Sequence, residues 1–238
     1  MNAVRALAGP GGRSYLAAVA LLAAGVASCA RVPGPPAPVG AYQPMSAAAF
    51  GAVAAATVPR TSELWWIRWR LTNGSDAPIG GRGAVRVAPP DSLRLDVGVP
   101  VMGRATLVLA GDSVWSEPPR LGAQVLPGEA VLWAMLGVVR PPAGTVRIER
   151  GEADGRALYR LTGADGAVTT LELRGDTLLA ATVVRGTRTV GRLDLARDAR
   201  GAIVRAVTVD VERGARFEMD VDRRQSGEVF PREIWTHP

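Results

Sequence analysis

The chain has 238 residues, of which 47% are hydrophobic and 21% charged, a balance typical of a folded globular protein. Its 28 basic residues are all arginines and exceed the 22 acidic residues by 6, but they are scattered singly, which argues against a nucleic-acid-binding surface. A single cysteine, Cys29, and a single histidine, His237, exclude disulfide frameworks, histidine-based catalytic triads and most metal sites. We therefore expect a protein that is not an enzyme and carries neither a metal nor a cofactor.

The first 28 residues have the pattern of a secretory signal peptide. Arg5 and Arg13 precede an apolar stretch, residues 15–26, and the segment contains no acidic residue. Twelve apolar residues are too few to span a bilayer, which takes about 20. The stretch ends in Val26-Ala27-Ser28-Cys29, which resembles the bacterial lipobox. This resemblance implies cleavage before Cys29 and attachment of diacylglycerol and a palmitate-like acyl chain there; the alternative is a plain secretory signal with a chance cysteine.

The next residues predict a tether followed by a folded domain. Ala30 follows the cysteine, and the lipoprotein resemblance then implies the outer membrane, on the side facing the periplasm. Five prolines in residues 33–44 indicate that 29–44 is a stiff, extended tether that does not pack. Residues 45–58 are rich in alanine and predict one short helix. The predicted organisation is a signal peptide over 1–28, a lipid-anchored tether over 29–44 and a single domain over 45–238.

From residue 62 onward the sequence alternates with the period of β-strands. Leu93, Leu95 and Val97 fall on one face of a predicted strand, and Trp65 and Trp69 fall on the face opposite Trp66. Turn signals such as Asn-Gly and Asp-Gly recur about every ten residues, as in antiparallel hairpins. The pattern predicts 11 or 12 short strands.

One segment, residues 130–139, interrupts this series. Pro127 and Glu129 mark the start of a helix, and Pro141 marks its end. The segment between them is apolar on all sides, so the helix must be buried. We therefore predict a mainly β fold with helices (α+β), an incomplete antiparallel β-barrel of about 11 strands wrapped around a buried helix.

Several of these segments together resemble the LolB-like lipoproteins of the LolA–LolB superfamily. The resemblance rests on Pro89–Gly103 with the following strand 105–109, on the Leu-Trp-Ala-Met-Leu-Gly segment 132–137, on the hairpins after 145 and on the lipobox. It covers about residues 62–223, and a DUF4292-like branch of uncharacterised lipoproteins shares the same half-barrel pattern. The resemblance implies an apolar cavity that accepts the acyl chains of lipids or lipoproteins.

The inward-facing apolar positions are the candidate lining of that cavity, the alternative being that they only form the core. These candidates are Leu93, Leu95, Val97, Leu107, Leu109, Trp133 and Met135.

The loop over 98–103 is a second candidate site. In the resembling family an apolar side chain protrudes from this loop and helps to hand cargo to the membrane, and Val101 and Met102 stand at that place. The family usually has one leucine between the proline and the glycine, so either residue could fill the role. The alternative is that both side chains pack back onto the sheet.

Two functions remain open from the sequence. The first is a carrier or acceptor that binds acyl chains, is held at the membrane through lipidated Cys29 and works with a periplasmic carrier protein. The second is a structural or assembly lipoprotein that docks a protein partner and carries no lipid cargo.

Overall fold

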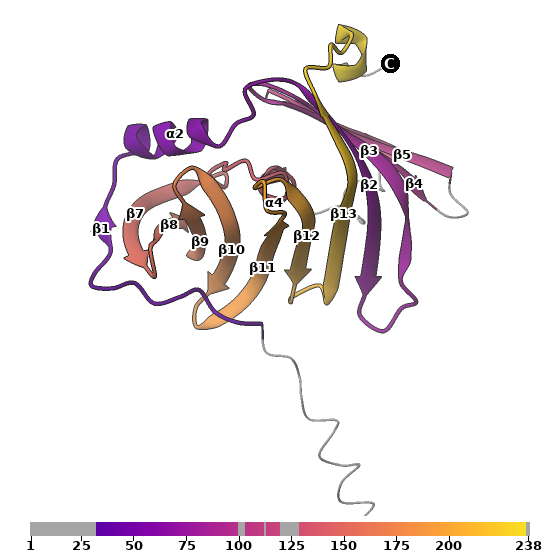
Figure 1. Ribbon diagram of the computed structural model, residues 1–238. Coiled ribbons are helices and arrows are strands. Elements are labelled where there is room, and N and C mark those ends of the chain that lie inside the picture. Colours follow the sequence, from indigo (N-terminus) through magenta and orange to yellow (C-terminus); the bar gives the residue numbers. More distant parts are fainter. Residues whose placement is uncertain (1–31, 100–102, 112, 120–128, 237–238) are drawn as a thin grey trace, which may run out of the picture. The chain divides into compact units, whose positions relative to one another are not determined.

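The structure is a computed structural model that describes residues 32–99, 103–111, 113–119 and 129–236. Gly34–Pro238 forms one compact unit. Its described strands join in a single 13-stranded sheet with the order β1-β7-β8-β9-β10-β11-β12-β13-β2-β3-β4-β5-β6 (Figure 1). The edge strands β1 and β6 do not pair with each other, so the sheet is open.

The sheet consists of two antiparallel meanders. The first meander comprises β2 (Glu63–Asn73), β3 (Ile79–Ala88), β4 (Ser92–Val99), β5 (Gly103–Ala110) and β6 (Ser113–Glu117). The second comprises β7 (Thr145–Ala153), β8 (Arg156–Gly163), β9 (Ala167–Arg174), β10 (Thr177–Arg185), β11 (Arg188–Arg197), β12 (Ile203–Asp210) and β13 (Ala215–Ser226). Because β13 pairs with β2, the two meanders form one continuous sheet.

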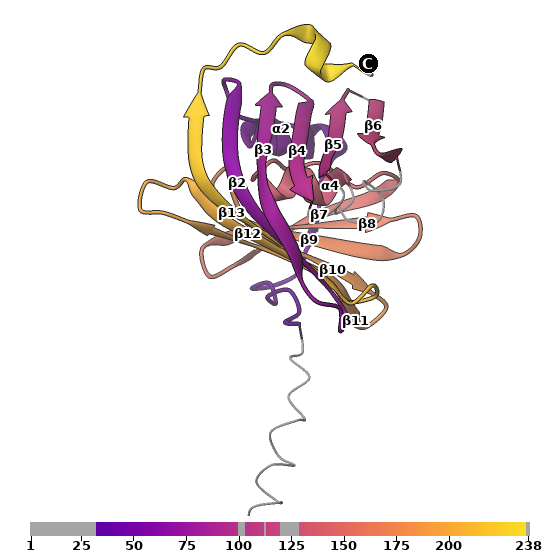
Figure 2. The same ribbon diagram turned by 90° about the vertical axis from the view of Figure 1, so that its right-hand side faces the viewer.

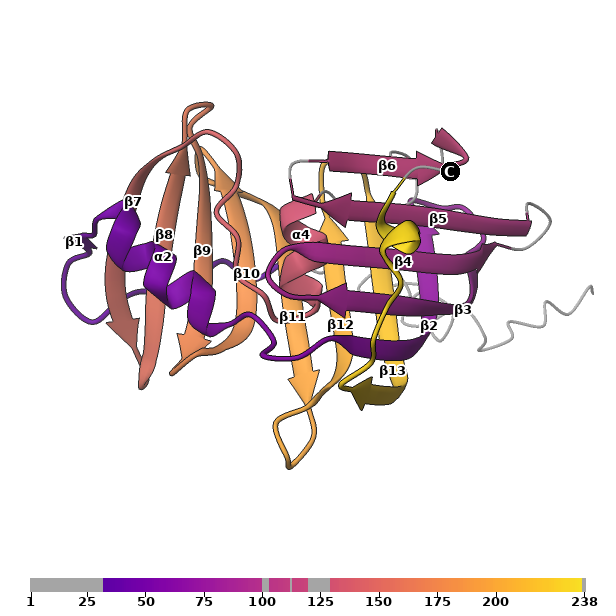
Figure 3. The same cartoon turned by 90° about the horizontal axis from the view of Figure 1, so that it is seen from above.

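The helices define an inner face of this sheet. Helix α2 (Ala47–Ala56) crosses the second meander (Figure 3), where Phe50 meets Tyr159 of β8 edge to face at 5.7 Å between ring centroids. Helix α4 (Glu129–Met135) buries Leu132, Trp133, Ala134 and Met135 in the core. Among the described residues no helix is long and apolar enough to cross a membrane.

Hydrogen bonds hold the two helical regions together. The Ser46 hydroxyl caps α2 by accepting from the backbone N–H of Ala49 at 3.2 Å. At the other end of α2, the Thr57 hydroxyl accepts from the backbone N–H of Val139, just beyond α4, at 2.8 Å. The segment that follows α4 is therefore fixed to the segment that follows α2.

The segment before α2 differs from the unpacked tether expected from its prolines. The short strand β1 (Gln43–Pro44) pairs with β7, and the backbone N–H of Val39 donates to the carbonyl of Glu152 at 2.6 Å. The guanidinium of Arg160 lies over the ring of Tyr42, 4.3 Å from the ring centroid. Extended, proline-rich backbone fits an edge strand because no neighbour needs its missing N–H groups.

The other end of the chain packs on the outer face of the first meander. The 3-10 helix η1 (Arg232–Trp235) lies over β4 and β5 (Figure 2), where a guanidinium N–H of Arg94 donates to the carbonyl of Ile234 at 2.8 Å. Each meander thus has a terminal segment of the unit packed against it.

The mainly β, open antiparallel architecture agrees with the sequence pattern. Residues 47–56 form the helix expected within 45–58. Within the described residues the strand count is 13 rather than about 11. Part of the difference is β1, whose two residues carry no alternating pattern to detect.

All strand pairings and the whole core cluster lie within Gly34–Pro238. A chain that begins at Gly34 keeps this core complete and is therefore able to fold alone.

Candidate functional site

A cavity of about 940 Å³ opens on the inner face of the second meander. Its floor is made by residues of β8 to β13 together with Leu71 and Asn73 of β2, and its roof by α4 and the segment that follows it. Cavities that hold small molecules in proteins usually measure about 300–1,000 Å³. This cavity is therefore large enough for a ligand.

The deepest row of the floor is apolar and contains small side chains. Cross-strand pairs connect Leu171 to Ala181, Ala181 to Leu193, Leu193 to Thr208 and Thr208 to Phe217. Because an alanine and a threonine stand between the larger residues, this row does not reach the roof along its whole length. The small side chains account for the open space.

A second row lies one step closer to the ends of the strands and is more polar. It runs through Thr169, Val183, Gly191 and Asp210, which are also cross-strand neighbours. Gly191 has no side chain, and a Cβ atom built there meets its nearest neighbour, Val183 Cβ, at 3.6 Å. An added Cβ atom therefore fits at Gly191 without a clash, on the wall of the cavity that this glycine lines.

The roof is formed by small and apolar residues. Ala130, Val131 and Ala134 of α4 line the cavity, as do Val139 and Pro142 behind it. The bond from Val139 to Thr57 fixes this part of the roof in place.

The mouth of the cavity is charged and is built from three neighbouring hairpin turns. Arg185, at the end of β10, donates to both carboxylate oxygens of Glu212 at 2.8 Å and lies 3.4 Å from Asp165. Arg213 lies 3.6 Å from Asp210. The backbone N–H of Ala167 donates to Asp165 and, with the charge of Arg185, lowers the pKa of that carboxyl.

The cavity thus changes from apolar at its deepest row to charged at its mouth. An amphiphile, with an apolar chain inside and a polar end at the three turns, matches this gradient.

Comparison with solved structures identifies the fold. The crystal structure of a LolA-superfamily protein from Nitrosomonas europaea superposes with a TM-score of 0.55 at 14% sequence identity, covering 79% of this chain and 97% of that chain. The chain has the LolA-superfamily fold. The resemblance noted in the sequence is confirmed at this level. No protein-family model matches the chain, and no curated protein sequence matches it.

Two further solved structures are similar to this chain with lower scores. A DUF1329-family protein from Desulfovibrio piger has a TM-score of 0.40 at 11% identity and covers 79% of this chain and 97% of its own. A domain of a proposed outer-membrane lipoprotein-sorting protein from Vibrio parahaemolyticus has a TM-score of 0.40 at 7% identity. The match covers 78% of this chain and 94% of that chain.

The candidate lining residues from the sequence all lie in the core, and none of them lines the large cavity of this LolA-type fold. They are at most 6% exposed: Leu93, Leu95, Val97, Leu107, Leu109, Trp133 and Met135. Leu93, Leu95 and Met135 meet around a small void of about 20 Å³. The structure places the cavity against the second meander instead of against β4 and β5.

Three other predicted site residues lie outside the described residues, namely Cys29, Val101 and Met102. The neighbours of the loop are described: β4 ends at Val99 and β5 begins at Gly103. Successive strands run antiparallel, so Val99 and Gly103 lie at the same end of the sheet as the turns of the cavity mouth.

The residues that the sequence reasoning missed are the small ones of the floor, Ala181, Gly191 and Thr208. Their signal was small size at inward-facing positions of otherwise apolar strands. In the part of the chain that the structure describes, no group of three or more His, Cys, Asp or Glu residues is placed to hold a metal ion.

Proposed function

We propose that this protein is an envelope lipoprotein that binds the acyl chains of lipids or lipoproteins in the cavity of the second meander. The observation that supports this most strongly is the polarity gradient, from Leu171 and Leu193 at the bottom to Arg185 at the mouth. Each methylene group moved from water into such a site contributes about 0.8 kcal/mol. The proposed role is binding.

The Gly191→Leu variant tests the cavity directly. Gly191 lines the cavity, and a Cβ atom there meets its neighbours only at ordinary contact distance, so we expect a leucine side chain at this position to extend into the cavity. We expect Gly34–Pro238 to bind a fluorescent fatty acid in titration and the variant to bind it at least about tenfold more weakly.

The matched control is Gly98→Leu on the outer face of β4, where a built Cβ meets only the carbonyl oxygen of Arg82, at 3.5 Å. It should bind like the wild type. Native mass spectrometry of the protein purified without detergent should also show bound lipid. A clean mass for the wild type, or equal binding by all three proteins, overturns the proposal and favours the assembly lipoprotein that docks a protein partner.

The anchor belongs to the same proposal. Lipidated Cys29 would hold the protein at the outer membrane, facing the periplasm, where a periplasmic carrier could deliver cargo to it. Replacing Cys29 by Ser removes the thiol that accepts the lipid, so the chain should remain uncleaved or appear in the soluble envelope fraction. Unchanged membrane fractionation with an unchanged mature mass contradicts the anchor.

The handover step would use the loop between β4 and β5. If Val101 and Met102 are exposed and contact the bilayer, changing both to Glu should alter stability by less than about 0.5 kcal/mol while abolishing transfer of cargo to liposomes. If they pack on the sheet, burial of two charges lowers the urea midpoint strongly. Measuring both quantities on the same double variant separates these outcomes.

A further inference from the structure

A row of arginines crosses the outer face of the first meander. Arg68 on β2 stands directly opposite Arg82 on β3, and Gly98 on β4 stands directly opposite Arg104 on β5. Arg82 and Gly98 are also neighbours, because a Cβ built at Gly98 lies 3.5 Å from the carbonyl oxygen of Arg82. Arg70 follows two residues after Arg68 on the same face. We call Arg68, Arg70, Arg82 and Arg104 the arginine row.

The fold does not neutralise this row. Arg68 is paired with Asp222 at 2.8 Å, whereas the side chains of Arg70 and Arg82 have no ion pair or hydrogen bond within the described residues. Arg104 lies 3.0 Å from Asp96.

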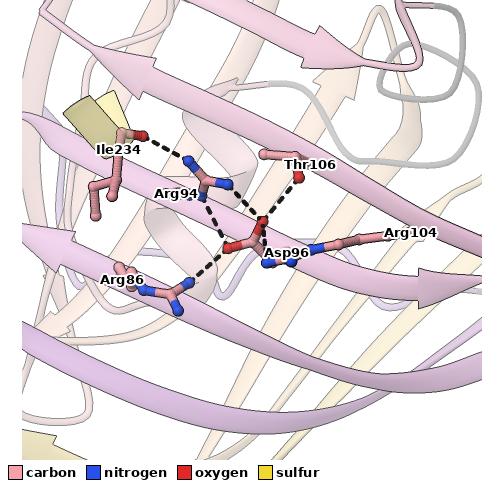
Figure 4. A network of polar contacts seen from close by, with 6 residues as sticks. All are labelled: Arg86, Arg94, Asp96, Arg104, Thr106 and Ile234. Atoms are coloured by element: carbon pink, nitrogen blue, oxygen red, sulfur yellow. Dashed lines mark hydrogen bonds and ion pairs between the residues drawn. The ribbon is translucent and has the colours of Figure 1, made fainter. Parts of the chain in front are cut away.

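Asp96 is shared, however. It also pairs with Arg86 at 2.6 Å and with Arg94 at 3.0 Å, so one carboxylate serves three guanidinium groups (Figure 4). Net positive charge therefore remains on this face.

The arrangement is unfavourable for folding alone. Like charges directly opposite each other on neighbouring strands destabilise a sheet. All four arginines of the row are exposed, Arg68 by 59% and Arg104 by 66% of their side chains. The segment that contains η1 does not cover these arginines. Its Ile234 contacts Arg94 on one side of Asp96, whereas Arg104 approaches Asp96 from the opposite side (Figure 4). On the side of β13, Glu218 stands opposite Arg70 and Asp220 stands opposite Arg68, but no acidic residue pairs with Arg82 in the described part of the chain. An external partner can supply negative charge at Arg82 and Arg104, the end of the row away from β13.

We propose that the arginine row docks on the surface of a bilayer that contains anionic phospholipids. A strand face presents its arginines side by side, and Gly98 leaves open space between Arg82 and Arg104, so that phosphate groups can approach both. Arginine pairs with phosphate through two parallel N–H donors. Charge complementarity with a dense layer of phosphates selects the bilayer as the occupant.

The docking would also orient the cavity. Arg70, Arg82 and Arg104 lie within three residues of the strand ends that carry the mouth turns. The inference is independent of the proposed acyl-chain binding, because the arginine row and the cavity lie on opposite faces of the sheet and share no residue.

Vesicle sedimentation tests the docking surface. The probe is Gly34–Pro238, which lacks the predicted anchor, with vesicles of phosphatidylglycerol and phosphatidylcholine or of phosphatidylcholine alone. We expect binding to the anionic vesicles only, and weaker binding as salt rises, since salt screens exposed charges. The Arg70→Gln/Arg82→Gln double variant should bind about thirtyfold more weakly, because each arginine near an anionic surface contributes about a fivefold factor.

The matched control is Arg174→Gln/Arg200→Gln, which removes the same charge from two exposed arginines at the other end of the strands. It should bind within about twofold of the wild type, and neither double variant should have a lower urea midpoint than the wild type. Equal weakening by the two double variants means that only net charge matters and overturns the proposal. Equal binding to phosphatidylcholine also overturns it, as does displacement by inorganic phosphate at matched ionic strength, which indicates a discrete anion site. Failure of fatty-acid binding leaves this test unaffected.

Discussion

The two meanders use their inner faces differently although they belong to one sheet. Against the first meander, Leu93 and Leu95 meet Leu132 and Met135 of α4 around a void of about 20 Å³. Against the second, small residues such as Ala181 and Gly191 leave about 940 Å³ open. The stacked rings of Trp69 and Phe217, 6.1 Å apart, stand near the boundary between the two regions. Side-chain size, more than backbone topology, decides which half is a core and which half is a site.

Helix α4 serves both halves and gives the largest expected contrast. Trp133 is 1% exposed, and the guanidinium of Arg140 lies 4.3 Å from its ring centroid. Val131, in contrast, lines the open cavity. Trp133→Ala should lower the free energy of unfolding by about 3–5 kcal/mol, because it empties a filled region. Val131→Ala should cost about 1 kcal/mol or less, since the space beside it is already open. The urea midpoints of the two variants measure this difference, and equal losses would contradict the distinction between the halves.

The sequence predicted which residues face inward but not how the space across from them is filled. Alternation placed Trp65 and Trp69 on the face opposite Trp66, and the structure buries both, at 1% and 3% exposure, while Trp66 stacks under Arg223. Leu93, Leu95 and Val97 were likewise placed on one face, and all three are buried. Periodicity carries no information about the opposite wall, so these core residues could not be separated from cavity residues. The docking of β1 on β7 was missed because proline-rich segments have no strand period.

The outer faces of the two meanders are alike, unlike the inner ones. Each carries a buried carboxylate: Asp96 under η1 and Glu149 beside the N-terminal segment, at 5% and 2% exposure. Burial acts to raise the pKa of Asp96, but hydrogen bonds from Arg94 and Thr106 and the charges of Arg94 and Arg104 outweigh it, so the pKa is lowered. The same balance, with Arg160 and Arg147 as donors, lowers the pKa of Glu149.

Asp96→Asn should therefore reduce stability near neutral pH by roughly 1.5–3 kcal/mol, the size of hydrogen bonds to a charged group. Because the folded-state pKa is depressed, this stabilisation is present above the unfolded value of about 4 and is lost as the pH falls through the folded value. The gap between wild type and variant in urea midpoint should thus close in acid. Glu149→Gln should change stability in the same direction, and a gap that stays constant from neutral pH to pH 2 would contradict the ionic origin.

The smallest expected effect compares one glycine from each inner face. Gly83 of β3 and Gly191 of β11 both lie within strands and have no positive φ. A Cβ at Gly83 would stand 2.6 Å from the carbonyl oxygen of Asp96, whereas one at Gly191 has no neighbour closer than 3.6 Å.

Gly83→Ala should therefore force the backbone of β4 to move and lower stability by about 1–3 kcal/mol, as overpacking does. Gly191→Ala should raise stability by about 0.5 kcal/mol, because alanine restricts the unfolded chain more than glycine and meets no clash. Thermal and urea midpoints of the pair give both values. Opposite signs would show that the first meander has no spare volume at its inner face while the second does. A destabilised Gly191→Ala would mean that the floor of the cavity is already packed, and the proposed binding site would then have to lie elsewhere.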